Sequence, residues 1–233
     1  MHYESKKIKH RLVFIPDAEM KEVLRWKLSL LKSDYPIFSS ISTFRKKNGL
    51  WSQLSRHGKK KERFFVIVDF CHAFHHVDRK MIAKVVPGIM EPRFDVCFVE
   101  LNGKEIIPAG FPTSNYLFEL FMSRRIDPRL LAWKDQFDGV VTRYADNILL
   151  TWGKNTSEAF EDLKKVFKDL KIRITPQYPR KWKDEPIRFC GLVIKKGARP
   201  KISRRKRKDL IKKAQNKSLA SLEGVTRFVN QFQ

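Results

Sequence analysis

Short apolar runs bounded by polar residues predict several strands in this chain. Residues 12–15 form one such run and residues 64–68 another, the second being typical of a buried strand. Residues 140–152 place an apolar run on each side of a polar tip, which predicts a hairpin. Residues 188–202 predict a second hairpin that turns around Gly197.

Longer stretches carry apolar residues at helical spacing. Residues 18–31, 115–126 and 157–170 predict amphipathic helices, and a basic helix is expected to start near Ser203. Strands mixed with packed helices in this order indicate an α+β fold. The core-facing residues expected for the first helix are Val23, Leu24, Trp26, Leu28 and Leu31.

The charge of the chain is strongly positive, with 49 Lys and Arg against 25 Asp and Glu, a formal net charge of +24. Residues 195–217 alone hold 12 basic residues and one acid. We expect nucleic acid as the polyanionic partner, and an anionic membrane surface is the weaker alternative. A solvated face or a frayed tail would give the same runs of basic residues. The residues expected to bind nucleic acid are Lys59, Lys60, Lys61, Arg204, Arg205, Lys206, Arg207 and Lys208.

With 233 residues, 42% of them hydrophobic, the chain can form one large domain or two subdomains. No apolar stretch approaches the roughly 20 residues that cross a bilayer, and residues 1–10 lack the apolar segment of a signal peptide. Cys71, Cys97 and Cys190 fit neither a disulfide framework nor zinc spacing. We expect a cytoplasmic protein without a membrane partner.

Two aspartates lie where strands are expected to end. Asp69 follows the apolar run of residues 64–68, and Asp146 lies at the tip of the hairpin, followed by Asn147. Each acid taken alone could simply cap a strand or shape a turn. Two strand-borne carboxylates that meet in the fold could instead hold two divalent ions and support an in-line phosphoryl displacement.

Four segments in order carry a resemblance to a known family. The stretch 143–147, Arg-Tyr-Ala-Asp-Asn, resembles the Arg-Tyr-Ala-Asp-Asp motif of bacterial reverse transcriptases. Residues 68–74 resemble the first palm motif of that family, and residues 107–115 resemble its Pro-Gln-Gly-x-Pro-Thr-Ser-Pro loop. Phe-Cys-Gly-Leu at 189–192 stands where the primer-grip hairpin would fall. The resemblance is to retron and retroelement-like enzymes, with the subclass left open.

The resemblance implies a right-hand polymerase fold and roles for single residues. Asp69 and Asp146, with Asn147 beside them, would be catalytic, and the two acids would hold Mg²⁺ (or Mn²⁺). Phe74 would exclude a 2′-hydroxyl, with a purely core role as the weaker alternative. The resemblance assigns dNTP binding to Arg11, Phe74, Gly110, Tyr144 and Lys181, and the primer grip to Phe189 and Gly191.

The resemblance also divides the chain into segments. Residues 1–63 would form fingers, and residues 64–187 a palm with an antiparallel sheet, with part of the fingers between 75 and 105. Residues 188–202 would form the primer-grip hairpin and residues 203–233 a basic, short helical thumb. So short a thumb leads us to expect limited processivity or dependence on an accessory protein or effector.

The expected function is RNA-directed DNA synthesis with dNTPs, from an RNA template onto a DNA primer or product. The template would be a dedicated structured RNA of the retron-like or defence-associated kind. Three departures from the family pattern, Ala109, Asn115 and Asn147, leave a second hypothesis open: an impaired palm domain that serves as an RNA-binding scaffold. An RNA polymerase or a template-free transferase on the same palm is a third, against which Phe74 argues.

Overall fold

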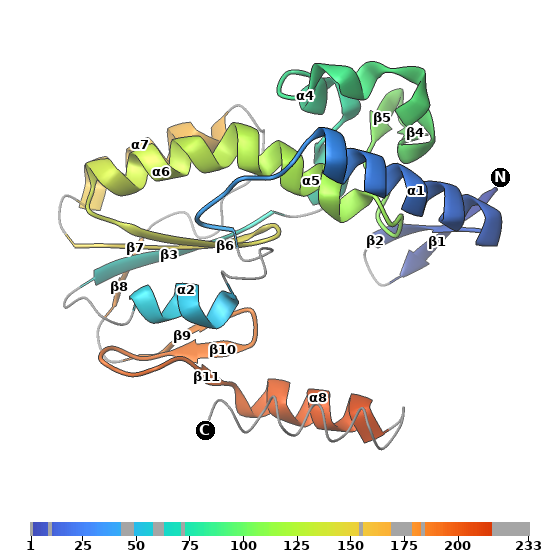
Figure 1. Cartoon of the computed structure of the whole chain (residues 1–233). Helices are drawn as coiled ribbons and strands as arrows, with labels where there is room; N and C mark the ends of the chain where they lie inside the picture. The colour runs from blue at the N-terminus through green and yellow to red at the C-terminus, as the bar shows by residue number, and fades with distance from the viewer. Residues whose placement is uncertain are drawn as a thin grey trace. The chain divides into compact units, whose positions relative to one another are not determined.

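The helices and strands of the computed structural model fall into two compact units, each assembled from separate stretches of the chain (Figure 1). The first unit contains Met1–Ser42, Asp69–Trp133 and Glu161–Ile174, and the second contains Thr43–Val68, Lys134–Phe160 and Thr175–Gln233. The expected division into fingers, palm, primer grip and thumb stays a prediction. The structure describes residues 2–8, 11–42, 49–57, 63–70, 73–153, 156–168, 179–182 and 185–215.

The first unit begins with an antiparallel pair, β1 (Tyr3–Ile8) and β2 (Arg11–Pro16). The strand predicted at 12–15 is confirmed, whereas β1 was not expected because it is polar and exposed along its whole length. Asp17 follows β2 and caps the next helix, since its carboxylate accepts the backbone N–H of Met20 at 2.7 Å.

Helix α1 (Ala18–Asp34) confirms the predicted helix but not the whole predicted face. Its buried stripe contains Met20, Leu24, Lys27 and Leu31. Trp26, expected in the core, is 57% exposed, because it lies beside this stripe on the helix surface. Its ring contacts the ammonium group of Lys27 at 4.3 Å instead.

The helix predicted at 115–126 is longer and less regular than expected. Helix α5 (Ser114–Phe121) continues through a π-helical turn, Met122–Ile126, into α6 (Asp127–Gln136). Pro128 falls in the first turn of α6, where a residue without an N–H is tolerated, and the wider turn before it accommodates the missing backbone hydrogen bond. A proline inside the helical pattern therefore reshapes the helix without ending it.

The segment from Ala73 to Ile106 consists of short helices, turns and one hairpin. The elements are α3 (Ala73–His76), α4 (Arg79–Ala83), two 3₁₀ turns (Pro87–Met90 and Pro92–Cys97), and the hairpin β4 (Val99–Leu101) and β5 (Lys104–Ile106).

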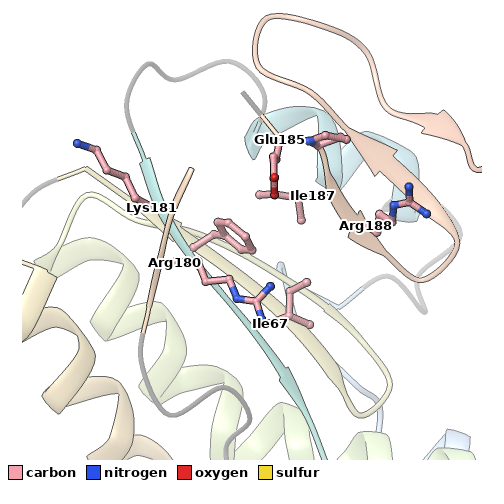
Figure 2. Close-up of a pocket in the computed structure, with 8 residues that line it drawn as sticks. Ile67, Arg180, Lys181, Glu185, Ile187 and Arg188 are labelled. Carbon is pink, nitrogen blue, oxygen red and sulfur yellow. The ribbon is translucent and has the colours of Figure 1, made fainter. Parts of the chain in front are cut away.

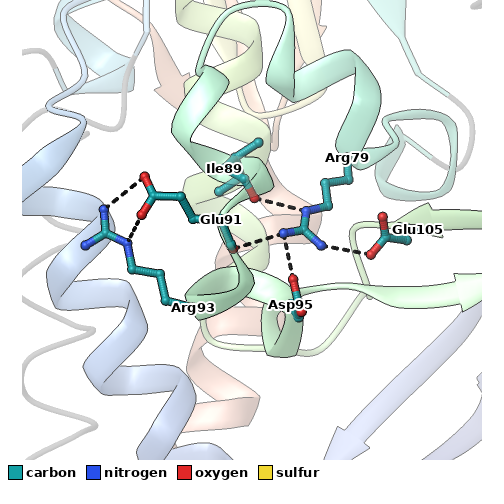
Figure 3. Close-up of polar contacts among 6 residues, drawn as sticks. All are labelled: Arg79, Ile89, Glu91, Arg93, Asp95 and Glu105. Atoms are coloured by element: carbon teal, nitrogen blue, oxygen red, sulfur yellow. Dashed lines mark hydrogen bonds and ion pairs between the residues drawn. The ribbon is translucent and has the colours of Figure 1, made fainter.

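One buried arginine, Arg79, connects these elements, and it is only 4% exposed. Its guanidinium donates to the carbonyls of Ile89 (2.9 Å) and Glu91 (3.1 Å), and it pairs with Asp95 (2.8 Å) and Glu105 (2.9 Å), as Figure 3 shows. Burial opposes the charge, but the hydrogen bonds to the two carboxylates outweigh it and raise the pKa of Arg79.

The second unit contains a four-stranded sheet in the order β6-β7-β3-β8. Strands β6 (Val140–Tyr144) and β7 (Asn147–Trp152) form the predicted antiparallel hairpin. Strand β3 (Arg63–Asp69) is the predicted buried strand, and β8 (Arg180–Trp182) pairs with it antiparallel. Almost every residue of the hairpin strands is buried, which explains why apolar residues follow one another in Val140-Val141 and Ile148-Leu149-Leu150 without alternating with polar ones.

A second sheet in this unit has the order β11-β10-β9, from β9 (Ile187–Phe189), β10 (Leu192–Ile194) and β11 (Lys201–Ile202). The predicted turn around Gly197 joins β10 to β11. A further turn at Cys190 and Gly191, where φ is 48° and 82°, joins β9 to β10. Positive φ at both central residues is typical of a type I′ turn, and Cys190 gave no sequence signal for it.

Helix α2 (Leu50–His57), which was not predicted, lies between the two sheets of this unit (Figure 1). Leu54 on its buried face joins a core formed with both sheets, and the Trp51 indole donates to the carbonyl of Pro200 at 2.9 Å. The other buried members of that core are Leu149, Trp182, Ile187, Phe189, Leu192 and Ile194.

The remaining helices follow the sequence pattern. Helix α7 (Thr156–Lys168) confirms the predicted amphipathic helix over its described residues. Helix α8 (Arg204–Gln215) begins after Ser203, as predicted, and the Ser203 hydroxyl accepts the N–H of Lys206 at 3.2 Å. The rest of the expected helical thumb, residues 216–233, lies outside the described residues. None of the helices in the described ranges is long and apolar enough to cross a bilayer.

Replacing Arg79 with methionine should lower the free energy of unfolding by about 2–4 kcal/mol, because two backbone carbonyls and two carboxylates lose a buried partner. Urea denaturation followed by circular dichroism measures this. Arg93→Met is the matched control, since Arg93 is 42% exposed in its ion pairs with Glu91 and Asp34, and its loss should cost less than about 1 kcal/mol. Equal losses in the two variants would contradict the role given to Arg79.

Candidate active site

Both predicted catalytic acids belong to the four-stranded sheet. Asp69 is the last residue of β3 and is exposed, and it is also the residue at which the chain passes from the second unit into the first. Asp146 lies in the turn between β6 and β7, and β7 is the neighbour of β3 in the sheet. The sheet thus carries one acid at a strand end and the other in the turn of the adjacent hairpin.

The turn that carries Asp146 is tight and polar. Tyr144 pairs with Asn147 across it, leaving Ala145 and Asp146 as the central residues. Ala145 has a positive φ of 53°. The first central position of a type II′ turn requires a positive φ, and glycine usually occupies it. An alanine in this region costs on the order of 1 kcal/mol, and such local strain is typical of functional turns.

The side chains of Asn147 and Arg143 each donate a hydrogen bond within this turn. The side-chain amide of Asn147 donates to Asp146 Oδ1 at 3.0 Å. The guanidinium of Arg143, fully buried in β6, donates to the carbonyl of Ala145 at 3.3 Å. Asn147 is therefore a hydrogen-bond donor to the acid before it, a role that an aspartate in the same place could not take while ionised.

A buried histidine holds both strands of this hairpin. His57, the last residue of α2, has no exposed surface. Its Nδ1 lies 2.8 Å from Thr151 Oγ1 on β7, and its Nε2 lies 2.9 Å from Thr142 Oγ1 on β6. Because both hydroxyls can donate or accept, a neutral ring satisfies both contacts at once.

Sequence reasoning did not select His57 as a functional residue. The available signal was its position three residues after Leu54 on one face of a short amphipathic helix. Two threonines inside otherwise apolar runs, Thr142 and Thr151, were the matching signal on the hairpin, because a buried hydroxyl needs a polar partner.

The loop with Gly110 packs on β2 in the first unit. The N–H of Phe14 donates to the carbonyl of Ala109 at 2.8 Å. Gly110 has φ 112°, and a Cβ there would lie 2.3 Å from the carbonyl oxygen of Phe14. The close approach that this glycine permits is therefore to β2, the strand that starts with the exposed Arg11.

The remaining predicted dNTP-binding residues have different surroundings. Phe74, on α3, is half-buried, and its ring meets that of Phe118 edge-on with centroids 5.3 Å apart. Tyr144 is 44% exposed, and Lys181 on β8 is exposed as well.

The expected primer-grip and nucleic-acid residues also differ in exposure. The side chain of Phe189 packs in the core of the second unit. A Cβ on Gly191 would lie 2.9 Å from Lys206 Cγ, so the β9–β10 turn lies against α8. On α8, Arg204, Arg205, Lys206, Arg207 and Lys208 are all exposed, while Lys59, Lys60 and Lys61 fall outside the described residues.

The donor chemistry of the sheet fits a hard cation. Asp69 and Asp146 offer carboxylate oxygens, and Asn147 adds an amide oxygen. Mg²⁺ keeps several waters and is commonly bound through one or two carboxylates plus substrate phosphates. Over the described residues no three His, Cys, Asp or Glu gather into a metal-binding group.

A family model described as reverse transcriptase (RNA-dependent DNA polymerase) matches residues 4–194. The chain belongs to the reverse transcriptase family. It is 26% identical over 187 residues to the retron Ec73 reverse transcriptase of Escherichia coli, a match that covers 70% of this chain. The chain spans 58% of the length of that relative. The resemblance to bacterial, retron-type enzymes drawn from the motifs is confirmed.

Solved structures agree on the fold. Telomerase from Candida albicans, in complex with a TWJ fragment of telomeric RNA, superposes with a TM-score of 0.57 at 14% identity, over 92% of this chain and 50% of that one. The corresponding Candida tropicalis structure gives 0.55 at 10% identity, over 97% and 52%. These likenesses confirm the predicted α+β, right-hand polymerase fold.

Replacing His57 with alanine should lower the free energy of unfolding by about 3 kcal/mol, since two buried hydroxyls lose their partner and a cavity forms. Chemical denaturation measures the loss. His76→Ala, at an exposed position on α3, is the control and should change stability by less than about 0.5 kcal/mol. A His57 variant as stable as the control would contradict the role of His57 in holding the two hairpin strands.

Proposed function

We propose that this chain is an RNA-directed DNA polymerase that adds dNTPs to a primer 3′-hydroxyl. The observation that carries the proposal is the placement of Asp69 and Asp146 on one sheet, at a strand end and in the turn of the adjacent hairpin, in a member of the reverse transcriptase family. Two carboxylates so placed suit an in-line phosphoryl transfer.

The residues of the chain would contribute by position and charge. Asp69 and Asp146 would hold two Mg²⁺ (or Mn²⁺) ions, which when bound stabilise the charge on the transferring phosphoryl group and activate the primer hydroxyl. The Asn147 amide orients Asp146. Arg11 would reach the triphosphate, and Phe74 would disfavour a 2′-hydroxyl on the incoming sugar.

The nucleic-acid partner is proposed to be a dedicated structured RNA with its DNA product. The net charge of +24 and the row of exposed basic residues on α8, from Arg204 to Lys208, support binding to a phosphate backbone. The likeness to a retron enzyme favours a retron-like or defence-associated role, with an accessory protein or effector as a further partner.

Primer extension on an RNA template, with dNTPs and Mg²⁺ or Mn²⁺, tests the proposal. We expect extension by the wild-type chain, and a loss of at least about 100-fold in Asp69→Ala and Asp146→Ala, because each acid would stabilise the transition state. Asp135→Ala removes an exposed acid of α6 that pairs with Lys134, and it should extend normally. Absence of extension with either metal, or extension that survives Asp146→Ala, would refute the assignment.

The alternative is an impaired palm domain that binds RNA as a scaffold, and Asn147 is the observation that favours it. Asn147→Asp separates the two functions. In a polymerase the added carboxylate should lower the metal concentration needed for half-maximal extension, because carboxylates bind Mg²⁺ more tightly than amides do. In a scaffold, RNA binding falls steeply with salt while neither chain incorporates nucleotide.

A further inference from the structure

A cavity of about 370 Å³ lies in the second unit, between β3, β8 and the residues that lead into β9 (Figure 2). Its apolar wall contains the half-buried Phe65 and Ile67 of β3 and the buried Ile187 of β9. Because side chains alternate along a strand, Phe65 and Ile67 project from the same face of β3. The cavity thus offers one aromatic ring and two aliphatic side chains to a ligand.

The charged residues at this cavity are mostly cationic. Arg180, Lys181 and Arg188 are exposed, and Glu185 is the one acid among the lining residues. Phe65 and Arg180 are direct cross-strand partners, which places the guanidinium beside the ring. Figure 2 shows the side chains of Lys181 and Arg188 extending away from the apolar wall, so Arg180 supplies the positive charge nearest to it.

Size and chemistry together define the ligand. A volume of about 370 Å³ is at the lower end of small-molecule sites and cannot admit a duplex. An apolar wall with an aromatic ring suits the flat face of a base, and arginines suit a phosphate. Unpaired bases, splayed out of a helix, are the groups that proteins most often recognise in this way.

We propose that this cavity binds one unpaired nucleotide of a nucleic-acid strand, with its base against Phe65, Ile67 and Ile187 and its phosphate on Arg180. Asp69 projects from the same face of β3, two residues beyond Ile67 and roughly 7 Å further along the strand. The bound nucleotide is therefore anchored beside the end of β3. This inference goes beyond the proposed polymerase function, and its test measures binding and needs no synthesis.

The test uses a fluorescent RNA duplex with and without an unpaired three-nucleotide overhang, and the affinity of the intact chain for each is measured by anisotropy. We expect the overhang to tighten binding by about 5- to 100-fold, the range that stacking of one base supplies. Phe65→Leu, which keeps an apolar side chain but removes the ring, and Arg180→Ala should each reduce this preference by at least half on a logarithmic scale.

Arg199→Ala is the matched control, because Arg199 is exposed in the loop between β10 and β11 and does not line the cavity. It should weaken binding to both RNAs alike and leave the preference intact. An abasic overhang should also lose the preference, and a DNA overhang tests whether the sugar matters. The proposal is overturned by a wild-type chain without preference, by an abasic overhang bound as tightly as a normal one, or by full preference in Phe65→Leu.

An excess of dNTP distinguishes the cavity from a dNTP site. Competition by dNTP with the overhang would overturn the proposal, while an unchanged preference supports it. Because no catalysis is involved, a failed primer-extension assay leaves this result interpretable, and a failed binding assay leaves the proposed polymerase function untouched.

Discussion

The imidazole of His57 ties the hairpin that carries Asp146 to the helix beneath it. Both strands of the hairpin are buried, and both present a threonine hydroxyl to the same ring, at 2.8 and 2.9 Å. Catalytic groups must be held within about 0.5 Å of their working positions by partners that are themselves fixed. Helix α2 is itself fixed, because Leu54 anchors it in the core shared by the two sheets of the second unit.

At the tip of the same hairpin, the local interactions are polar and under strain. Ala145 adopts a positive φ, and Asn147 donates to the carboxylate of Asp146. An aspartate at 147 would place a second negative charge beside Asp146, and the amide avoids that repulsion. The substitution that distinguishes this chain from the family motif thus has a defined local effect: it exchanges one negative charge for a hydrogen bond.

Much of the fold was predictable because its signals are local. The apolar runs of β3, β6 and β7 and the helical spacing of α7 predicted elements that the structure confirms. The motifs around Asp69 and Asp146 pointed to the family that the comparisons then established. The elements that escaped prediction depend on partners that their own residues do not indicate.

Strand β1 is wholly exposed and polar, and only its pairing with β2 makes it a strand. Helix α2 is short, and it is stabilised by contacts with segments about 85 to 150 residues away, such as Thr142 and Pro200. Trp26 was assigned to the core on spacing alone, although the buried stripe of α1 runs beside it. The cavity at Phe65 likewise exists only where strands from separate parts of the chain meet.

Metal binding at the sheet tests the central claim most directly. Mn²⁺ can be titrated into the chain, bound to a primer–template and a non-extendable dNTP, and followed by electron paramagnetic resonance. We expect about two ions per wild-type chain, a marked loss of affinity in both Asp69→Asn and Asp146→Asn, and no change in Asp135→Asn. Undiminished Mn²⁺ binding in both of the first two variants would contradict the assignment of Asp69 and Asp146 as metal ligands.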